Sequence, residues 1–113
     1  MKKLINKMAL VRDNIPHLIK KKGCACNYII LHSDKDYQAM LKSKLVEEAN
    51  EVRLTSSKDE IIEELADCLE VIKCLKESFN ITDEEIENRR SAKEQSKGSF
   101  KKRFYLHSFE ENE

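Results

Sequence analysis

The sequence predicts a mainly α-helical domain, and three observations support this. Two long stretches, about 35–54 and about 58–79, repeat apolar residues every three or four positions, which is the spacing of one helix face, and a third, polar stretch follows from 82. Each stretch follows a serine or threonine of the kind that caps a helix. Charged residues make up 37% of the chain, which is typical of helices with long polar faces. We therefore expect three main helices, preceded by a short one.

The first elements are the short helix and a strand. Asp13 or Asn14 can cap a helix that begins near Pro16, because proline is favoured in the first turn. Gly23 would end this helix. The segment Cys26–Leu31 is rich in Tyr and Ile, which predicts a strand.

Capping residues mark the starts of the three main helices. Ser33 or Asp34 would cap the first and Ser57 the second, while Thr82 with Glu85 forms a capping-box pattern before the third. The predicted helices are about Lys35–Leu54, about Lys58–Phe79, and a third from Thr82 to about Ser96.

The end of the chain alternates apolar and polar residues, which predicts a second strand over 100–106. We expect the two strands to pair with each other or with a partner subunit. All 113 residues would form one domain, with residues 1–9 and 108–113 flexible. Because a chain with this many charged residues has a small core, we expect its apolar faces to be buried in a homodimer or homotetramer.

Charge and cysteine content exclude several classes of protein. Lys plus Arg equals Asp plus Glu at 21 each, which argues against a nucleic-acid coat protein or a binder of anionic membranes. No stretch predicts a signal peptide or a membrane span, so we expect a cytoplasmic protein with free thiols. Zinc binding by Cys24, Cys26 and His32 is disfavoured, because C-x-C is not the usual spacing and no second cysteine pair follows.

Acidic residues form two motifs on the first and second main helices. Glu47, Glu48 and Glu51 give the form E-E-x-x-E, and Glu64 and Asp67 give E-x-x-D. Projected at about 100° per residue, Glu48 and Glu64 fall within the apolar arcs of their helices. Carboxylates that converge between two helices repel one another, and a divalent cation removes the repulsion.

Oxygen ligands favour hard cations, so Mg²⁺ is the expected ion and Mn²⁺ the next candidate. Solvated surface acids are the alternative, and they fit Glu60, Glu63 and Glu70 well. The spacing alone leaves both interpretations of the two motifs open.

With these motifs the chain resembles the all-α nucleoside triphosphate pyrophosphohydrolases, the MazG-like group. It resembles most closely their phosphoribosyl-ATP pyrophosphohydrolase-like branch. The resemblance runs from about Asn6 to Leu106, and rests on LVRDNIP at Leu10–Pro16, the acidic helices, and KGSF at Lys97–Phe100. It implies a MazG-like helical bundle, and an enzyme that cuts a nucleotide between its α- and β-phosphates.

The resemblance also implies roles for individual residues. Metal ligands would be Glu48, Glu51, Glu64 and Asp67, while Glu47 would act with Glu48 in catalysis by orienting a water or holding a second ion. Contacts to the substrate phosphates would come from Arg12, Lys93 and Lys97.

This chain departs from the family pattern at two places. Two residues separate Lys7 from the Leu10–Val11–Arg12–Asp13 run, and Ser99 stands where a second glycine is expected after Gly98. The alternative function is a non-catalytic helical partner or regulatory module on the same scaffold. The sequence indicates no preference for a base or a sugar.

Overall fold

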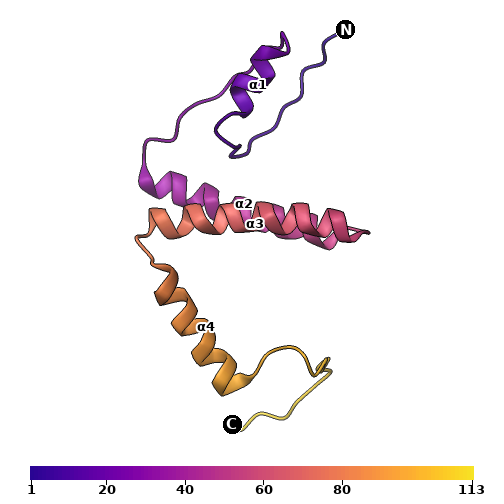
Figure 1. Ribbon diagram of the computed structural model, residues 1–113, viewed down its shortest axis with the longest axis vertical. Coiled ribbons are helices and arrows are strands. Elements are labelled where there is room, and N and C mark those ends of the chain that lie inside the picture. Colours follow the sequence, from indigo (N-terminus) through magenta and orange to yellow (C-terminus); the bar gives the residue numbers. More distant parts are fainter. The chain divides into compact units, whose positions relative to one another are not determined.

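The computed structural model describes residues 1–113 and contains four helices and no strand. The helices are α1 (Ile15–Lys21), α2 (Asp34–Arg53), α3 (Lys58–Ser78) and α4 (Asp83–Lys97), as labelled in Figure 1. The mainly α-helical prediction is confirmed. The chain divides into two compact units, residues 1–80 and 81–113, and each is described by itself.

The capping residues begin the three long helices as predicted. Ser33 Oγ accepts a hydrogen bond from the Asp36 amide at 3.3 Å, and Ser57 Oγ accepts one from the Glu60 amide at 3.2 Å. Thr82 and Glu85 form the full capping box, with each side chain accepting from the other's backbone amide at 3.1 Å. These bonds satisfy amides that have no partner within their own helix, and so fix where each helix starts.

Helices α2 and α3 form an antiparallel hairpin, and they lie side by side in Figure 1. The side-chain amide of Gln38, near the start of α2, donates to the backbone oxygen of Ser78 at 3.2 Å and to its hydroxyl at 3.0 Å. Ser78 is the last residue of α3, so the two helices run in opposite directions. Leu41 and Val71 are the only buried hydrophobic residues, at 2% and 8% exposure.

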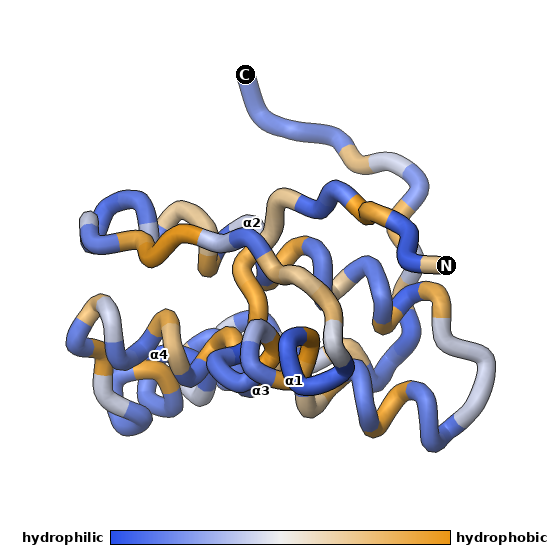
Figure 2. Tube along the Cα trace, turned by 90° about the horizontal axis from the view of Figure 1, so that it is seen from above, coloured by the Kyte–Doolittle hydropathy of each residue, from blue (hydrophilic) through white to orange (hydrophobic).

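The apolar face of α3 is only partly covered. Hydrophobic positions recur between hydrophilic ones along the helices in Figure 2. Val71 is the buried hydrophobic residue of α3, whereas Leu65 and Leu69 keep 47% and 66% exposure. The stripe of Ile61, Leu65 and Leu69 is spaced at i, i+4 and i+8, and remains an uncovered apolar surface.

The prediction of two strands is wrong. Residues 26–31 have no regular structure, because no neighbouring segment supplies the backbone hydrogen bonds that a strand needs. Within 100–106, a turn forms instead, closed by a hydrogen bond from the Arg103 amide to the Phe100 carbonyl at 3.2 Å. Arg103 has a φ of 61°, in the left-handed region, which is incompatible with a strand. Lys102 already interrupts the apolar alternation at this point.

Glycines follow the first and last helices. Gly23 has a φ of 80°, and its amide donates to the Lys20 carbonyl at 2.9 Å just after α1. Gly98 caps α4 with a φ of 84° and a ψ of −178°, a combination that only glycine adopts readily. Gly23 therefore ends α1 as predicted, and Gly98 ends α4 in the same way.

Candidate functional site

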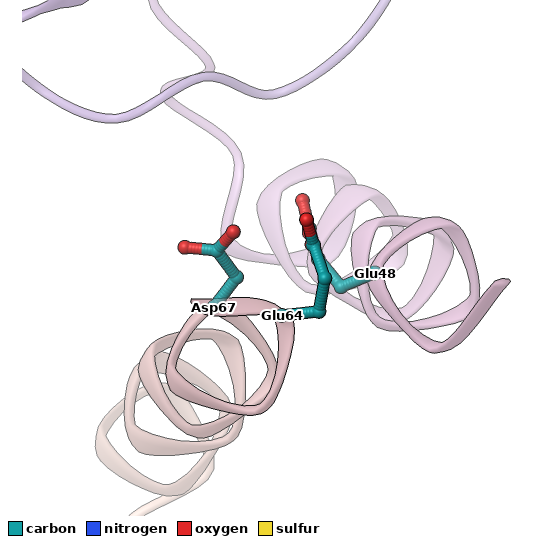
Figure 3. A group of neighbouring side chains, drawn as sticks. All are labelled: Glu48, Glu64 and Asp67. Carbon is teal, nitrogen blue, oxygen red and sulfur yellow. The ribbon is translucent and has the colours of Figure 1, made fainter. Parts of the chain in front are cut away.

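Three of the predicted acids converge between α2 and α3. One carboxylate oxygen from each of Glu48, Glu64 and Asp67 lies within 4.8 Å of the other two. Figure 3 shows the three carboxylates extending to the same side of the helix pair. Glu64 and Asp67 share a face of α3 because they are three residues apart, and the antiparallel pairing brings Glu48 of α2 beside them.

The convergence places like charges close together in a partly desolvated position. Only 13% of the Glu48 side chain is exposed. The pKa of Glu64 is raised by desolvation, and further by the negative charges of Asp67, Glu51 and Glu48. Glu64 has no cationic partner, so it is the carboxylate with the most to gain from a bound cation.

Lys44 supplies a cation from the same helix as Glu48. Its ammonium nitrogen lies 3.4 Å from Glu48 Oε1 and 3.2 Å from Glu47 Oε1, and only 17% of its side chain is exposed. Lys44 was not among the predicted site residues. The signal was present, because a lysine three and four residues before two glutamates shares their helix face.

Arg12 supplies a second cation from the N-terminal segment. Its guanidinium donates to Asp67 Oδ1 at 2.7 Å, across 55 residues of sequence. This hydrogen bond raises the pKa of Arg12, and the charges of Asp67, Glu70 and Glu48 act in the same direction. In the structure Arg12 therefore contacts one of the acids. The role predicted for it from the sequence was a contact to a substrate phosphate.

Glu47 and Glu51 lie at the edge of the three-acid cluster. Glu47 is 38% exposed and also lies 3.7 Å from the ammonium group of Lys7. Glu51, predicted as a fourth ligand, is exposed and is not among the three converging acids, although its charge contributes to the raised pKa of Glu64. The set that fits one ion directly is therefore Glu48, Glu64 and Asp67.

The chemistry of this donor set suits a hard divalent cation. Three carboxylates offer oxygen ligands only, and Mg²⁺ usually binds through one or two carboxylates and completes its octahedron with water or substrate oxygens. No cysteine or histidine belongs to the cluster, so a soft metal is disfavoured. All four cysteines of the chain are free thiols.

An open hollow, called the basic hollow below for its two unpaired lysines, lies in the second unit. It has a volume of about 330 Å³ at the end of α4, and its lining includes Lys93, Glu94, Lys97, Gly98 and Phe100. Arg90 also lines it, but its charge is paired with two glutamates on its own helix at 2.7 and 2.5 Å. Lys93 and Lys97 form no ion pair and remain available to an anion.

Comparison with known proteins returns no match among protein-family models, curated proteins or solved structures. None of the four helices has the length and apolar composition that crossing a membrane requires.

Proposed function

We propose that the chain is a Mg²⁺-dependent nucleotide pyrophosphohydrolase of the MazG-like type. It would cleave between the α- and β-phosphates of a nucleoside triphosphate or a related nucleotide. The observation that carries the proposal is the convergence of Glu48, Glu64 and Asp67 from two motifs on two helices, with one oxygen from each within 4.8 Å. Converging carboxylates destabilise the folded state through desolvation and mutual repulsion, unless cations neutralise them.

Each group of residues has a part in this reaction. Bound to the three acids, Mg²⁺ would neutralise phosphate charge and lower the pKa of a water. Glu47, at the edge of the cluster, would orient the attacking water and take up its proton, or hold a second ion, after its ion pairs with Lys7 and Lys44 are broken. Water adds to phosphorus, the bond to the bridging oxygen breaks, and pyrophosphate leaves with that oxygen.

Lys93 and Lys97, on the second unit, are further proposed contacts to phosphate. Lys93 and Lys97 form no ion pair and line one hollow, so they can contact phosphate oxygens without first breaking an ion pair. A triphosphate carries several negative charges, and a bound metal ion leaves some of them unbalanced. Phe100 at the rim of the hollow is 96% exposed and offers an apolar surface to the rest of a ligand.

The same proposal includes assembly into a cytoplasmic homodimer or homotetramer. Leu41 and Val71 are the only buried hydrophobic residues of the single chain, which is a small core for 113 residues. The stripe of Ile61, Leu65 and Leu69 on α3 is long enough to pack against the same stripe of a second copy, as in a four-helix arrangement.

Product analysis tests the proposed reaction. The chain is incubated with a panel of nucleoside triphosphates and phosphoribosyl-ATP, with Mg²⁺ or with a chelator, and the products are separated by anion exchange. We expect a monophosphate and pyrophosphate from at least one member of the panel, in the Mg²⁺ samples only. Release of orthophosphate and a diphosphate, or no turnover of any nucleotide, contradicts the proposal.

A non-catalytic helical partner module is the second candidate. It is favoured by one observation: Arg12 and Lys44 already neutralise part of the acidic cluster, as they would in a purely structural network. Such a module has no use for a divalent cation. Mg²⁺ binding that depends on Glu64 therefore separates the two candidates, because Glu64 has no internal cationic partner.

A further inference from the structure

The N-terminal segment, residues 1–23, is connected to the α2–α3 hairpin through the acids of the candidate site. Two ion pairs make the connection: Arg12 with Asp67 at 2.7 Å, and Lys7 with Glu47 at 3.7 Å. Asp67 belongs to the three-acid cluster, and Glu47 is the neighbour of Glu48. A cationic ligand of these acids therefore shares its carboxylates with the contacts that hold the segment in place.

A divalent cation coordinated by Asp67 would lie close to the Arg12 guanidinium that is hydrogen-bonded to the same carboxylate. The guanidinium occupies Oδ1 at 2.7 Å, and an ion coordinated by Asp67 would lie within a few ångströms of it. The two cations would repel each other, and the ion carries twice the charge. Arg12 is 58% exposed, so its side chain is free to move away into solvent.

We propose that a divalent cation at Glu48, Glu64 and Asp67 displaces Arg12 from Asp67 and loosens the N-terminal segment, so that the freed guanidinium can bind a phosphate oxygen of the nucleotide. This inference rests on the proposed function, and it adds an order of binding: the metal ion first, the anionic ligand second. Arg12 is then a counter-cation of the empty site and a phosphate contact of the loaded one.

Helix α1 provides a way to observe this release. It has seven residues, and isolated helices of that length are unstable in water. None of its residues is buried, and its N-cap side chain makes no capping hydrogen bond. Once Arg12 leaves Asp67, α1 loses one of the contacts that hold it near the hairpin, and its amides should exchange with solvent more rapidly.

The test compares Arg12→Gln with a control that removes an equivalent charge. Arg53 ends α2, is exposed and forms no ion pair, so Arg53→Gln measures the general effect of losing one positive charge from the same unit. Mg²⁺ affinity is measured by calorimetry, and amide exchange of residues 15–21 is followed by mass spectrometry with and without Mg²⁺. Neither readout depends on catalytic activity.

We expect Arg12→Gln to bind Mg²⁺ about two- to fivefold more tightly than the wild type, because an exposed ion pair no longer has to be broken. Arg53→Gln should change the affinity by less than about twofold, since distant exposed charges are screened. In the wild type, Mg²⁺ should increase exchange in residues 15–21. In Arg12→Gln, exchange should already be fast without Mg²⁺ and should not rise further.

Two results would overturn the inference, and they have different meanings. If the wild type binds Mg²⁺ through Glu64 but Arg12→Gln binds no more tightly than Arg53→Gln, and α1 exchange ignores Mg²⁺, the displacement of Arg12 is wrong and the metal site stands. If the wild type binds no Mg²⁺, or if Glu64→Gln binds it equally well, the metal site fails together with the inference.

Discussion

Arg12 and Asp67 are 55 residues apart in the sequence and form an ion pair of 2.7 Å. The pair links the N-terminal segment to α3 at the point where three carboxylates converge. It also shows how the chain offsets its own acidic charge: Arg12 contacts Asp67, Lys44 contacts Glu48, and Glu64 has no cationic partner. Glu64 is therefore the acid at which the proposed cation would offset the most uncompensated charge.

Conservative removal of one ligand charge should weaken metal binding without unfolding the helices. In Glu48→Gln and Asp67→Asn the side chain keeps its shape and loses its charge, so we expect Mg²⁺ affinity to fall about tenfold or more, equivalent to about 1.4 kcal/mol. Calorimetry measures the affinity, and circular dichroism should show unchanged helix content. Mg²⁺ should also raise the melting temperature of the wild type, because a ligand of the folded state stabilises it.

The matched control is Glu63→Gln. Glu63 is an exposed neighbour of Glu64 on α3 and lies outside the converging set. Its substitution should leave Mg²⁺ affinity within about twofold of the wild type, as expected for a screened surface charge. A loss equal to that of Glu48→Gln would mean that net charge, and not coordination, governs binding.

Lys97 should matter for turnover more than for stability. It lines the basic hollow and forms no ion pair. Lys97→Ala should therefore lower kcat/KM by an amount equivalent to about 1–3 kcal/mol of transition-state free energy, the range for a lost hydrogen bond to a charged group. Lys101 lies beyond the end of α4 and does not line the hollow, so Lys101→Ala should have a smaller effect. Steady-state kinetics of the two variants measure the difference.

The alternative role for Lys97 is complementing the dipole at the end of α4, where it is the last residue. In that case Lys97→Ala would cost only a few tenths of a kcal/mol of stability. Unchanged kinetics with a slightly lower melting temperature would support that role and remove Lys97 from the proposed substrate contacts.

Leu69 tests whether the apolar stripe of α3 contacts a second copy. It is 66% exposed in the single chain, so Leu69→Glu should be tolerated by the fold and should dissociate an assembly that buries it. Light scattering at micromolar concentration should change from dimer or tetramer to monomer. Leu41 lies in the buried core at 2% exposure, so Leu41→Ala should instead lower the free energy of unfolding by about 2–5 kcal/mol.

A wild-type chain that is already monomeric at micromolar concentration would contradict the proposed assembly. In that case the exposed stripe of Ile61, Leu65 and Leu69 is not an interface between copies.

The capping box of α4 should show a defined pH dependence. The backbone amide and the hydroxyl of Thr82 donate to the Glu85 carboxylate and lower its pKa below the ordinary value of 4.5. A carboxylate with a lower pKa in the folded state stabilises it above the unfolded pKa, and this contribution is lost as the pH falls through the folded pKa. We therefore expect an NMR titration of Glu85 with a midpoint below 4.5, and smaller protection factors for the α4 amides, corrected for the intrinsic exchange rate, at still lower pH.

Glu85→Gln provides the comparison, since its amide does not titrate. The part of the α4 exchange that depends on pH through Glu85 should disappear in this variant. A Glu85 midpoint at or above the ordinary glutamate value would show that the capping box does not form in solution.

Local signals in the sequence were sufficient to predict the helices. The caps at Ser33, Ser57 and Thr82 act within a single turn of chain, so their effect can be judged from neighbouring residues alone. The strands were wrong because a strand depends on a partner segment, which neighbouring residues do not reveal. At 100–103 the backbone forms a turn, which the alternating pattern of Phe100, Phe104 and Leu106 did not indicate.

For the candidate site, too, local spacing was predictable and long-range contacts were not. Helical spacing predicted that Glu64 and Asp67 share a face, and the antiparallel hairpin explains why Glu48 joins them. The ion pair of Arg12 with Asp67 was not predictable, because it depends on how a segment 55 residues away folds back onto α3. Lys44 was not predicted, although it lies four residues before Glu48 and its ion pair follows from local helix spacing.

Mg²⁺-dependent release of pyrophosphate by the wild type and by Glu64→Gln, with Glu63→Gln as control, tests the central claim most directly. Glu64 is the converging acid without a cationic partner, so its substitution removes a metal ligand and disturbs no ion pair of the chain. We predict release by the wild type and Glu63→Gln only when Mg²⁺ is present, and release by Glu64→Gln that is at least about a hundredfold slower, equivalent to about 2.7 kcal/mol. Equal rates in all three proteins, or release that does not require Mg²⁺, would contradict a metal-dependent active site at Glu48, Glu64 and Asp67.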